Sequence, residues 1–385
     1  MTCRKTRKSK GGKFIGRGTY GCSFRPALKC IGENTVEQNS ISKVLVIKNA
    51  ENEFKINELL SVIDPEQIFT LYPYKICKPV LYHSDKKDMD NKCDEFLDVS
   101  HRAIFLKDGG DNLNDVFFRI PKNGFNKVHR ALFRALHNLF IGLEYLHSKN
   151  FVHLDIKAAN VVCKITSGTE LKFFGFKIGK PTYLMKFIDF GFSGDVGTVF
   201  SKKNTFEYVC WPFELRFVKD KYLNGTMLLE TKDLNNYLNT VANSRLMYVP
   251  YWLYKGSPIL PSLDEYNTIL KYLKTLEPEG KKEMRRDLLK KADVYALGLL
   301  LSNCYYQVTG IRKIGVNTYT DDSTLVKAKP SAALSGRQHE LVTVPLYNLV
   351  DKMTEPDFRK RFNATDALSE FRTVLQGIET YFSGK

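Results

Sequence analysis

The chain lacks any long apolar run, and this absence argues against a membrane-spanning helix. Across its 385 residues no stretch approaches the ~18 consecutive apolar residues that such a helix needs. The basic opening, MTCRKTRKSKGGK, is followed by no apolar segment, so it does not have the pattern of a secretory signal peptide. We expect residues 1–13 to form a flexible, solvated tail, and binding of an acidic or nucleic-acid partner is its alternative role.

Paired cysteines, internal repeats and low-complexity segments beyond the tail are missing as well. The eight cysteines are scattered, without the CxxC spacing of zinc sites and without the dense framework of disulfide-rich proteins. We therefore expect reduced thiols, which favour a cytoplasmic or nuclear protein.

What is present is a large globular chain with excess positive charge. With 385 residues, 43% of them apolar and 12% aromatic, it can bury two cores of ordinary size. Its net charge of +16 favours an anionic partner such as a nucleotide, an acidic protein or nucleic acid. The sequence leaves the oligomeric state open.

Hydrophobic periodicity divides the chain near residue 108. Residues 14–48 contain strand patterns around a glycine turn, and NAENEFKINELLSVID has helical spacing. A later apolar strand ends in KDGGD, which marks a boundary near Asp108 to Asp111. Beyond it, one apolar stripe predicts a long buried helix through Leu132, Leu136, Leu139, Leu143 and Leu146.

Glycines recur in GRGTYG at Gly16, Gly18 and Gly21. Without side chains, such residues let backbone amides approach phosphates closely. An ordinary structural turn explains the pattern equally well. A dinucleotide-binding turn requires a following helix, whereas CSFRPALKC predicts a second strand.

Two further motifs carry oxygen ligands. FVHLDIKAAN contains Asp155, Lys157 and Asn160, and FIDFGFSG places Asp189 between an apolar strand and a glycine turn. Each motif alone is compatible with a solvated turn. Taken together, Asp155, Asn160 and Asp189 are the set of oxygen ligands that Mg²⁺ prefers beside nucleotide phosphates.

With these motifs in this order, the chain resembles the eukaryotic-type protein kinase family. HLDIKAAN resembles its catalytic loop, DFG its metal-binding turn and DVYALGLLL its central buried helix. WPFE resembles an altered end of the activation segment, so the resemblance implies a buried ion pair between Glu214 and Arg361. The style of the motifs also resembles kinases of large DNA viruses, which would imply the host cytoplasm or the virion.

The resemblance implies an α+β, bilobal fold. A small β-rich N-lobe with one main helix would span residues 14–108, and a larger, mainly helical C-lobe residues 109–385, with an insertion at about 216–290. We expect this insertion to dock partners or substrates, with structural padding as the alternative.

The implied activity is transfer of the γ-phosphoryl group of ATP to serine or threonine hydroxyls of protein substrates. Asp155 would orient the substrate hydroxyl, Lys157 would steady the transferring group, and Asn160 with Asp189 would hold Mg²⁺ or, alternatively, Mn²⁺. The nucleotide itself would meet the three glycines, a strand lysine, Ile104 and Phe105.

Two lysines compete for the phosphate-anchoring position, Lys43 in SISK and Lys48 in LVIK. The following helix should present a glutamate to this lysine, and Lys48 stands only five residues before Glu53, whereas Lys43 stands ten before it. We therefore favour Lys43 with Glu53 and keep Glu58 as the reserve.

Departures from the family pattern leave alternatives open. Ser23 replaces a usual valine, Leu154 replaces a usual arginine, and Asn160 lies 29 residues before Asp189, roughly twice the family spacing. The rival functions are a pseudokinase scaffold and a small-molecule kinase of aminoglycoside or choline type. Because Leu154 cannot pair with a phosphate, we expect an enzyme that is active as synthesised.

Overall fold

The computed structural model describes most of the chain. The described residues are 12–17, 21–35, 37–81, 100–119, 125–166, 171–173, 176–179, 183–199, 210–218, 229–233, 236–237, 263–309 and 336–384. Gly18 lies outside them, as does about half of the expected insertion. The chain forms two compact units, one of Met1–Gly110 with Ile188–Gly191 and one of Asp111–Phe187 with Phe192–Lys385.

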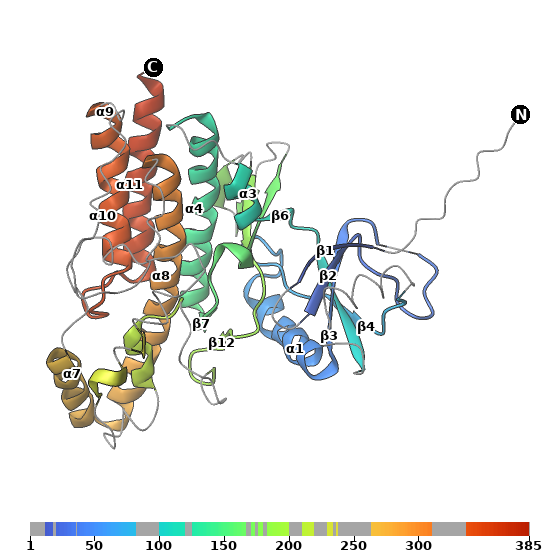
Figure 1. The fold of residues 1–385 in the computed structure, drawn as a ribbon, viewed down its shortest axis with the longest axis horizontal. Coiled ribbons are helices and arrows are strands. Elements are labelled where there is room, and N and C mark those ends of the chain that lie inside the picture. Colours follow the sequence, from blue (N-terminus) through green and yellow to red (C-terminus); the bar gives the residue numbers. More distant parts are fainter. Residues whose placement is uncertain are drawn as a thin grey trace, which may run out of the picture. The chain divides into compact units, whose positions relative to one another are not determined.

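The first unit is a five-stranded antiparallel sheet with one helix (Figure 1). The strand order is β1-β2-β3-β5-β4, and the helix α1 follows β3 directly. The bounds are Lys13–Arg17 (β1), Gly21–Arg25 (β2), Ser40–Val46 (β3), Ile47–Ile63 (α1), Lys75–Cys77 (β4) and His101–Lys107 (β5).

Two boundaries correct the expectations from sequence. Lys13 is the first residue of β1 and not the last of a flexible tail, because it pairs with Arg25 on β2. Lys48 lies in the first turn of α1, since β3 ends at Val46, so the apolar run SISKVLVIK is not one strand.

The sheet of the first unit buries both of its faces. One face contributes to a cluster with Cys22, Phe24 and Phe105, and the other packs Leu45 and Ile104 against Ala50 of α1. This alternation follows from the two-residue period of a strand. The side chain of Lys43 consequently points to one definite side of the sheet.

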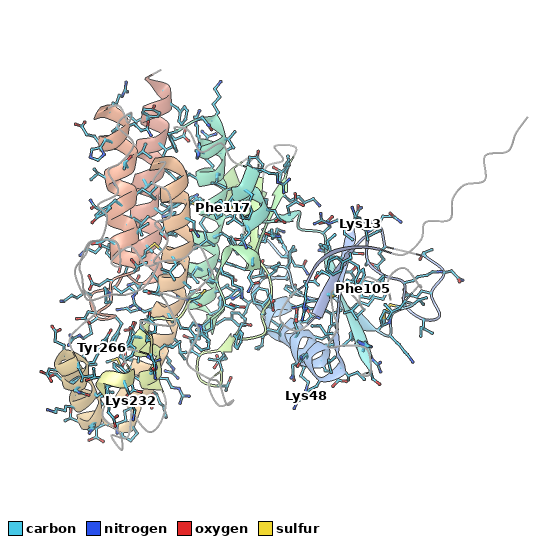
Figure 2. All side chains as sticks on the ribbon, viewed as in Figure 1. Lys13, Lys48, Phe105, Phe117, Lys232 and Tyr266 are labelled. Carbon is cyan, nitrogen blue, oxygen red and sulfur yellow. A yellow bond between two sulfur atoms is a disulfide. The ribbon has the colours of Figure 1, made fainter. Side chains whose placement is uncertain are left out.

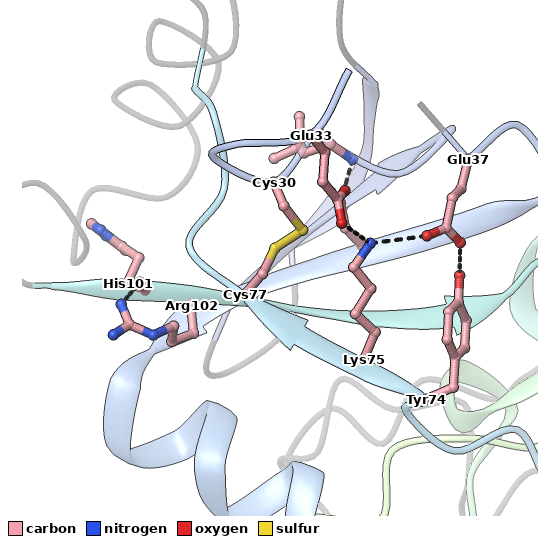
Figure 3. The surroundings of a disulfide bond; sticks show 10 residues. Cys30, Glu33, Glu37, Tyr74, Lys75, Cys77, His101 and Arg102 are labelled. Atoms are coloured by element: carbon pink, nitrogen blue, oxygen red, sulfur yellow. Dashed lines mark hydrogen bonds and ion pairs between the residues drawn. A yellow bond between two sulfur atoms is a disulfide. The ribbon is translucent and has the colours of Figure 1, made fainter. Parts of the chain in front are cut away.

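A disulfide joins Cys30 to Cys77 within the first unit, at a sequence separation of 47 (Figure 3). Cys22 is disulfide-bonded too. Beside the first bond, Lys75 pairs with the carboxylates of Glu33 and Glu37 at 2.7 and 3.0 Å. The expectation of reduced thiols is therefore wrong for this unit.

The second unit is mainly helical, and α4, α8, α10 and α11 lie side by side in it (Figure 1). The helices are Leu113–Arg119 (α3), Lys127–Ser148 (α4), Leu263–Thr275 (α7), Pro278–Thr309 (α8), Gly336–Gln338 (α9), Val344–Met353 (α10) and Ala364–Ser383 (α11). Shorter turns are Ala158–Asn160 (η2), Phe213–Val218 (η3) and His339–Thr343 (η5). The units together give the expected α+β fold with a β-rich and a helical lobe.

Short strands accompany these helices. They are Asp111–Asn112 (β6), Phe151–Val152 (β7), Val161–Ile165 (β8), Leu171–Phe173 (β9), Phe176–Gly179 (β10), Tyr183–Phe187 (β11) and Gly194–Asp195 (β12). β8 pairs with β6 and β11, whereas β7 pairs with β12 and β9 with β10.

The helix α4 carries the predicted leucine stripe, and all five leucines are at most 3% exposed. The helix α8 begins at Pro278, so the last residues assigned to the insertion from sequence are its first turns. The first turns of α8 are polar and lack an apolar stripe, so the sequence did not indicate where this helix begins. Within the described residues, no helix combines the length and apolarity needed to cross a membrane.

Candidate functional site

Lys43 in the first unit holds two carboxylates. Its Nζ lies 3.0 Å from Oε1 and 2.8 Å from Oε2 of Glu53, and 3.3 Å from Oδ1 of Asp189. Glu53 is 8% exposed on α1, while the reserve candidate Glu58 faces solvent on the same helix. The chain thus brings together three of the residues singled out from sequence.

This cluster keeps its lysine charged. Burial alone would lower the pKa of Lys43, yet the carboxylates of Asp189 and Glu53 outweigh it and raise that pKa. Burial also raises the pKa of Glu53, against the attraction of Lys43. The ammonium of Lys43 is therefore shared between the carboxylates of Glu53 and Asp189.

Asp189 is held in an unusual backbone conformation. Its φ is +63°, in the left-handed region that residues other than glycine seldom adopt. The next residue, Phe190, is buried at 3% exposure, whereas the Asp189 side chain keeps 33%. Burial of the neighbouring ring fixes the turn and leaves the carboxylate accessible.

The glycine turn of the first unit has two different glycines. A Cβ at Gly21 would lie 2.2 Å from the carbonyl oxygen of Val44, so close packing on β3 requires glycine there. A Cβ at Gly16 would meet nothing within 4 Å. Packing on β3 therefore accounts for Gly21 without a ligand, whereas Gly16 borders open space.

The two candidates on β5 are separated by the pleat of the sheet. Ile104 is the partner of Lys43 in the β3–β5 register, so the two side chains share one face. Phe105 points to the other face, where Lys75 lies 4.8 Å from its ring centroid. The side chain of Ile104 therefore lies on the Lys43 face and that of Phe105 on the opposite face, while contact of either residue with a nucleotide stays a prediction.

In the second unit, the loop between β7 and β8 assembles Asp155, Lys157 and Asn160. The Nζ of Lys157 lies 3.0 and 3.1 Å from the two carboxylate oxygens of Asp155. The Nδ2 of Asn160 donates to Asp155 Oδ2 at 2.6 Å and to its carbonyl oxygen at 3.0 Å. Asp155 and Asn160 are only 4% and 5% exposed.

Asp293, the first residue of the apolar run in α8, orients this loop. Its carboxylate is fully buried and accepts from the backbone N–H groups of His153 at 2.7 Å and Leu154 at 2.6 Å. His147 Nε2 lies 3.2 Å away. Leu154 has a φ of +58°, so these bonds hold a backbone that leucine disfavours.

Two further contacts anchor the chain around residues 210–218. Trp211 Nε1 donates to the carbonyl oxygen of Leu154 at 2.7 Å. Arg361 Nη2 lies 2.5 Å from Glu214 Oε1, and the guanidinium also lies 4.9 Å from the ring of Tyr295. The ion pair implied by the sequence is present and buried.

Sequence reasoning missed Asp293 and Trp211 as positioning residues. A carboxylate that opens the apolar run DVYALGLLL is a usable signal, because a buried acid needs several donors. Trp211 gave no such signal, since a tryptophan in a polar loop has many possible partners.

Comparison with known proteins agrees with this geometry. A family model described as protein kinase domain matches residues 108–210, which include Asp155, Asn160 and Asp189. Smooth muscle myosin light chain kinase of Gallus gallus is 30% identical over 66 residues, which is 17% of this chain and 4% of that protein.

A solved structure of the autoinhibited serine kinase domain of the giant muscle protein titin aligns with 95% of this chain and 80% of that one. Its TM-score of 0.44 and identity of 14% are too low to support a conclusion. The family model supports a narrower one: residues 108–210, which carry the motifs quoted above, are similar to a protein kinase domain.

Proposed function

We propose that this protein transfers the γ-phosphoryl group of ATP to serine or threonine hydroxyls of protein substrates. The observation that carries the proposal is the Asp155 carboxylate, held by Lys157 and Asn160 in a loop that Asp293 positions. A fixed carboxylate can accept the hydrogen bond of a substrate hydroxyl and orient its oxygen for attack.

Lys157 has a second role in this proposal. Its ammonium, 3.0 Å from Asp155 Oδ1, supplies a positive charge next to the reacting hydroxyl. Negative charge builds up on the transferring phosphoryl group and is best stabilised by preorganised cations. A lysine at this position in the family pattern favours serine and threonine over tyrosine as acceptors.

The residues present fit a magnesium ion. Asn160 turns its amide nitrogen to Asp155, which leaves its amide oxygen as the atom for a cation. Asp189 offers an accessible carboxylate. Amide and carboxylate oxygens are ligands that Mg²⁺ accepts, and Mn²⁺ has the same preference. When bound, the metal neutralises charge on the phosphates of ATP.

Lys43 would bind the phosphates of ATP. It is the cation of the cluster with Glu53 and Asp189, and its charge persists at neutral pH. The helix α1 supplies Glu53, so the position of that helix sets the position of the ammonium. The first unit would contribute to catalysis through this coupling, because the position of α1 determines whether Lys43 can bind the phosphates.

The test is incubation with labelled ATP and Mg²⁺ in the presence of generic acidic and basic protein substrates, followed by phosphoamino-acid analysis. We expect label on serine and threonine, and a loss of at least a hundredfold in turnover for Asp155→Asn, about 2.7 kcal/mol of barrier. Asp195→Asn, at the half-buried end of β12, is the matched control and should retain turnover.

Each rival function predicts a different result. ATP binding without any turnover would favour the pseudokinase scaffold, and phosphorylation of aminoglycosides or choline without proteins would favour a small-molecule kinase. Label on tyrosine alone would contradict the acceptor class. The viral affiliation, the cellular location and a docking role for the insertion remain proposals that these measurements leave aside.

A further inference from the structure

Arg216, in the turn η3, is a buried cation without a hydrogen-bond acceptor. Arg216 is only 8% exposed, and its buried Nη1 makes no hydrogen bond. Among the described residues, no carboxylate or carbonyl oxygen is recorded within hydrogen-bond or ion-pair distance of this guanidinium.

The neighbouring rings fix the orientation of the guanidinium. The Arg216 Cζ lies 4.6 Å from the ring centroid of Phe213 and 5.5 Å from that of Tyr237. The two rings contact each other edge to face, with centroids 5.4 Å apart. Aromatic faces stabilise the cation but accept no conventional hydrogen bonds, so its N–H donors stay available for a planar anion.

The nearby acids are already used. Glu214 is bound by Arg361 at 2.5 Å, and Asp357 by Arg359 at 2.8 Å. Among the described residues, the charged groups that act on Tyr237 are therefore two guanidinium groups, Arg216 and Arg361, and the carboxylate of Glu214. Leaving a buried charge unpaired costs several kcal/mol, so the arrangement favours an incoming negative charge.

We propose that Arg216 binds an acidic side chain of the substrate peptide, either a carboxylate or a phosphoryl group. This proposal rests on the proposed kinase function and names its substrate class. Arg216 lies five residues after Trp211, whose indole is bonded to the residue before Asp155. At ~3.3 Å per extended residue, the five residues from Trp211 to Arg216 span at most about 17 Å, a distance that an extended substrate peptide can bridge.

The shape of the site selects a peptide over a polyanion. Nucleic acids are bound by several exposed cations that follow a row of phosphates. Arg216 instead offers one guanidinium, nearly enclosed by Phe213 and Tyr237, which suits a single side chain inserted from outside. The net charge of +16 would add long-range attraction for an acidic substrate.

The experiment uses three peptides that differ only beside the acceptor serine, with alanines, glutamates or a phosphoserine. For the wild-type chain we expect kcat/KM to be at least tenfold higher for the glutamate and phosphoserine peptides than for the alanine peptide. Arg216→Gln should bring the three values within twofold of one another. Arg134→Gln, which removes an arginine on α4, is the control and should keep the preference.

Arg216→Lys covers the case in which the glutamine variant does not fold. It keeps the charge without the planar fork, so we expect part of the preference to remain. A purely structural role for Arg216 would lower activity equally on all three peptides and leave their ratio unchanged, which would overturn the proposal. Equal kcat/KM for all peptides in the wild type would overturn it as well.

Binding separates this inference from the proposed function. If no peptide is phosphorylated, the proposed function fails, but fluorescence anisotropy with the labelled glutamate and phosphoserine peptides still tests the site. We expect binding by the wild type and by Arg134→Gln, at least tenfold weaker binding by Arg216→Gln, and a smaller loss for Arg216→Lys. Equal binding of acidic and alanine peptides would contradict an anion site.

Discussion

In the first unit, Lys43 is shared between Glu53 and Asp189, and its side chain and that of Glu53 keep 13% and 9% exposure. In the second unit, Arg361 is bound to Glu214 with 0% and 2% exposure and lies over the ring of Tyr295. Both are buried ion pairs in one chain. The first has a surplus carboxylate and access to solvent, whereas the second has neither.

This difference predicts different functions for the two pairs. A cation that serves two carboxylates can exchange one of them for a ligand phosphate at low cost, because one interaction replaces another. A sealed pair has no such exchange partner, and losing one member leaves a buried charge. We therefore expect variants of the first pair to affect turnover and variants of the second to affect stability.

The largest effect should come from breaking the sealed pair. Arg361→Met leaves the Glu214 carboxylate buried without its cation, so we expect a loss of about 4 kcal/mol in the free energy of unfolding. Urea denaturation followed by circular dichroism measures this. The control Arg359→Met removes a half-exposed arginine from Asp357 and should lose at most about 1 kcal/mol. Similar losses for both variants would contradict the comparison.

The accessible pair should respond in the opposite way. Lys43→Met should lower ATP turnover by at least a hundredfold, about 2.7 kcal/mol of barrier, with a small change in unfolding free energy. Lys48→Met is the matched control, because Lys48 is exposed in the first turn of α1. Steady-state kinetics with saturating ATP checks both. Greater loss for Lys48→Met would mean that the strand alignment is wrong.

A third ion pair, exposed to solvent, tests the role of burial. Hydrogen bonds from Arg134, assisted by Arg130, lower the pKa of Glu379 to about 2 from 4.5. A carboxyl with a lowered pKa stabilises the fold fully above pH 4.5 and loses this contribution as the pH falls toward 2. Glu379→Gln should therefore be less stable than the wild type at pH 7, by about 1 kcal/mol at low salt.

The pH dependence of the same two proteins, Glu379→Gln and the wild type, is the control for that prediction. The stability difference between Glu379→Gln and the wild type should shrink steadily between pH 4.5 and about 2, because protonation removes the charge in the wild type too. Thermal unfolding at a series of pH values follows this. A difference that stays constant with pH would exclude an electrostatic origin.

The smallest effect is expected from the activation segment. Leu154 replaces the arginine that binds an activating phosphate in many relatives, and Asp293 and Trp211 hold its backbone instead. Alanine at Ser193, Thr198, Ser201 and Thr205 should leave turnover within about twofold; the last two sites lie outside the described residues. Phosphatase treatment should change equally little. A fall of a hundredfold would show that another cation has replaced the arginine.

Sequence reasoning succeeded where the signal is local. Lys43 and Glu53 stand ten positions apart, a separation that spans one strand end and the first turns of a helix, so spacing together with the family pattern identified the pair. Sequence could not tell which of Ile104 and Phe105 shares a face with Lys43, because neighbouring strand residues face opposite sides and the choice depends on register. Register is set by β3, which lies far away in sequence.

Contacts between distant residues could not be predicted in this way. Asp293 reaches Leu154 across 139 residues, and nothing near either residue announces the bond. Cys30 and Cys77 are joined only because the loop after β2 comes to lie beside β4. Nothing near Arg216 in the sequence indicates that it is buried, since its environment includes Tyr237 from a segment about twenty residues later.

The Cys30–Cys77 disulfide means that a preparation of this protein can contain two chemical species that differ at this bond. A cross-link that closes a loop of 47 residues restricts the unfolded chain and contributes about 4 kcal/mol in the chain-entropy description. Reducing agents routinely added during purification would open it in some molecules and not in others. A measured rate would then be an average over both species, and counting free thiols in each batch would show in what ratio they were mixed.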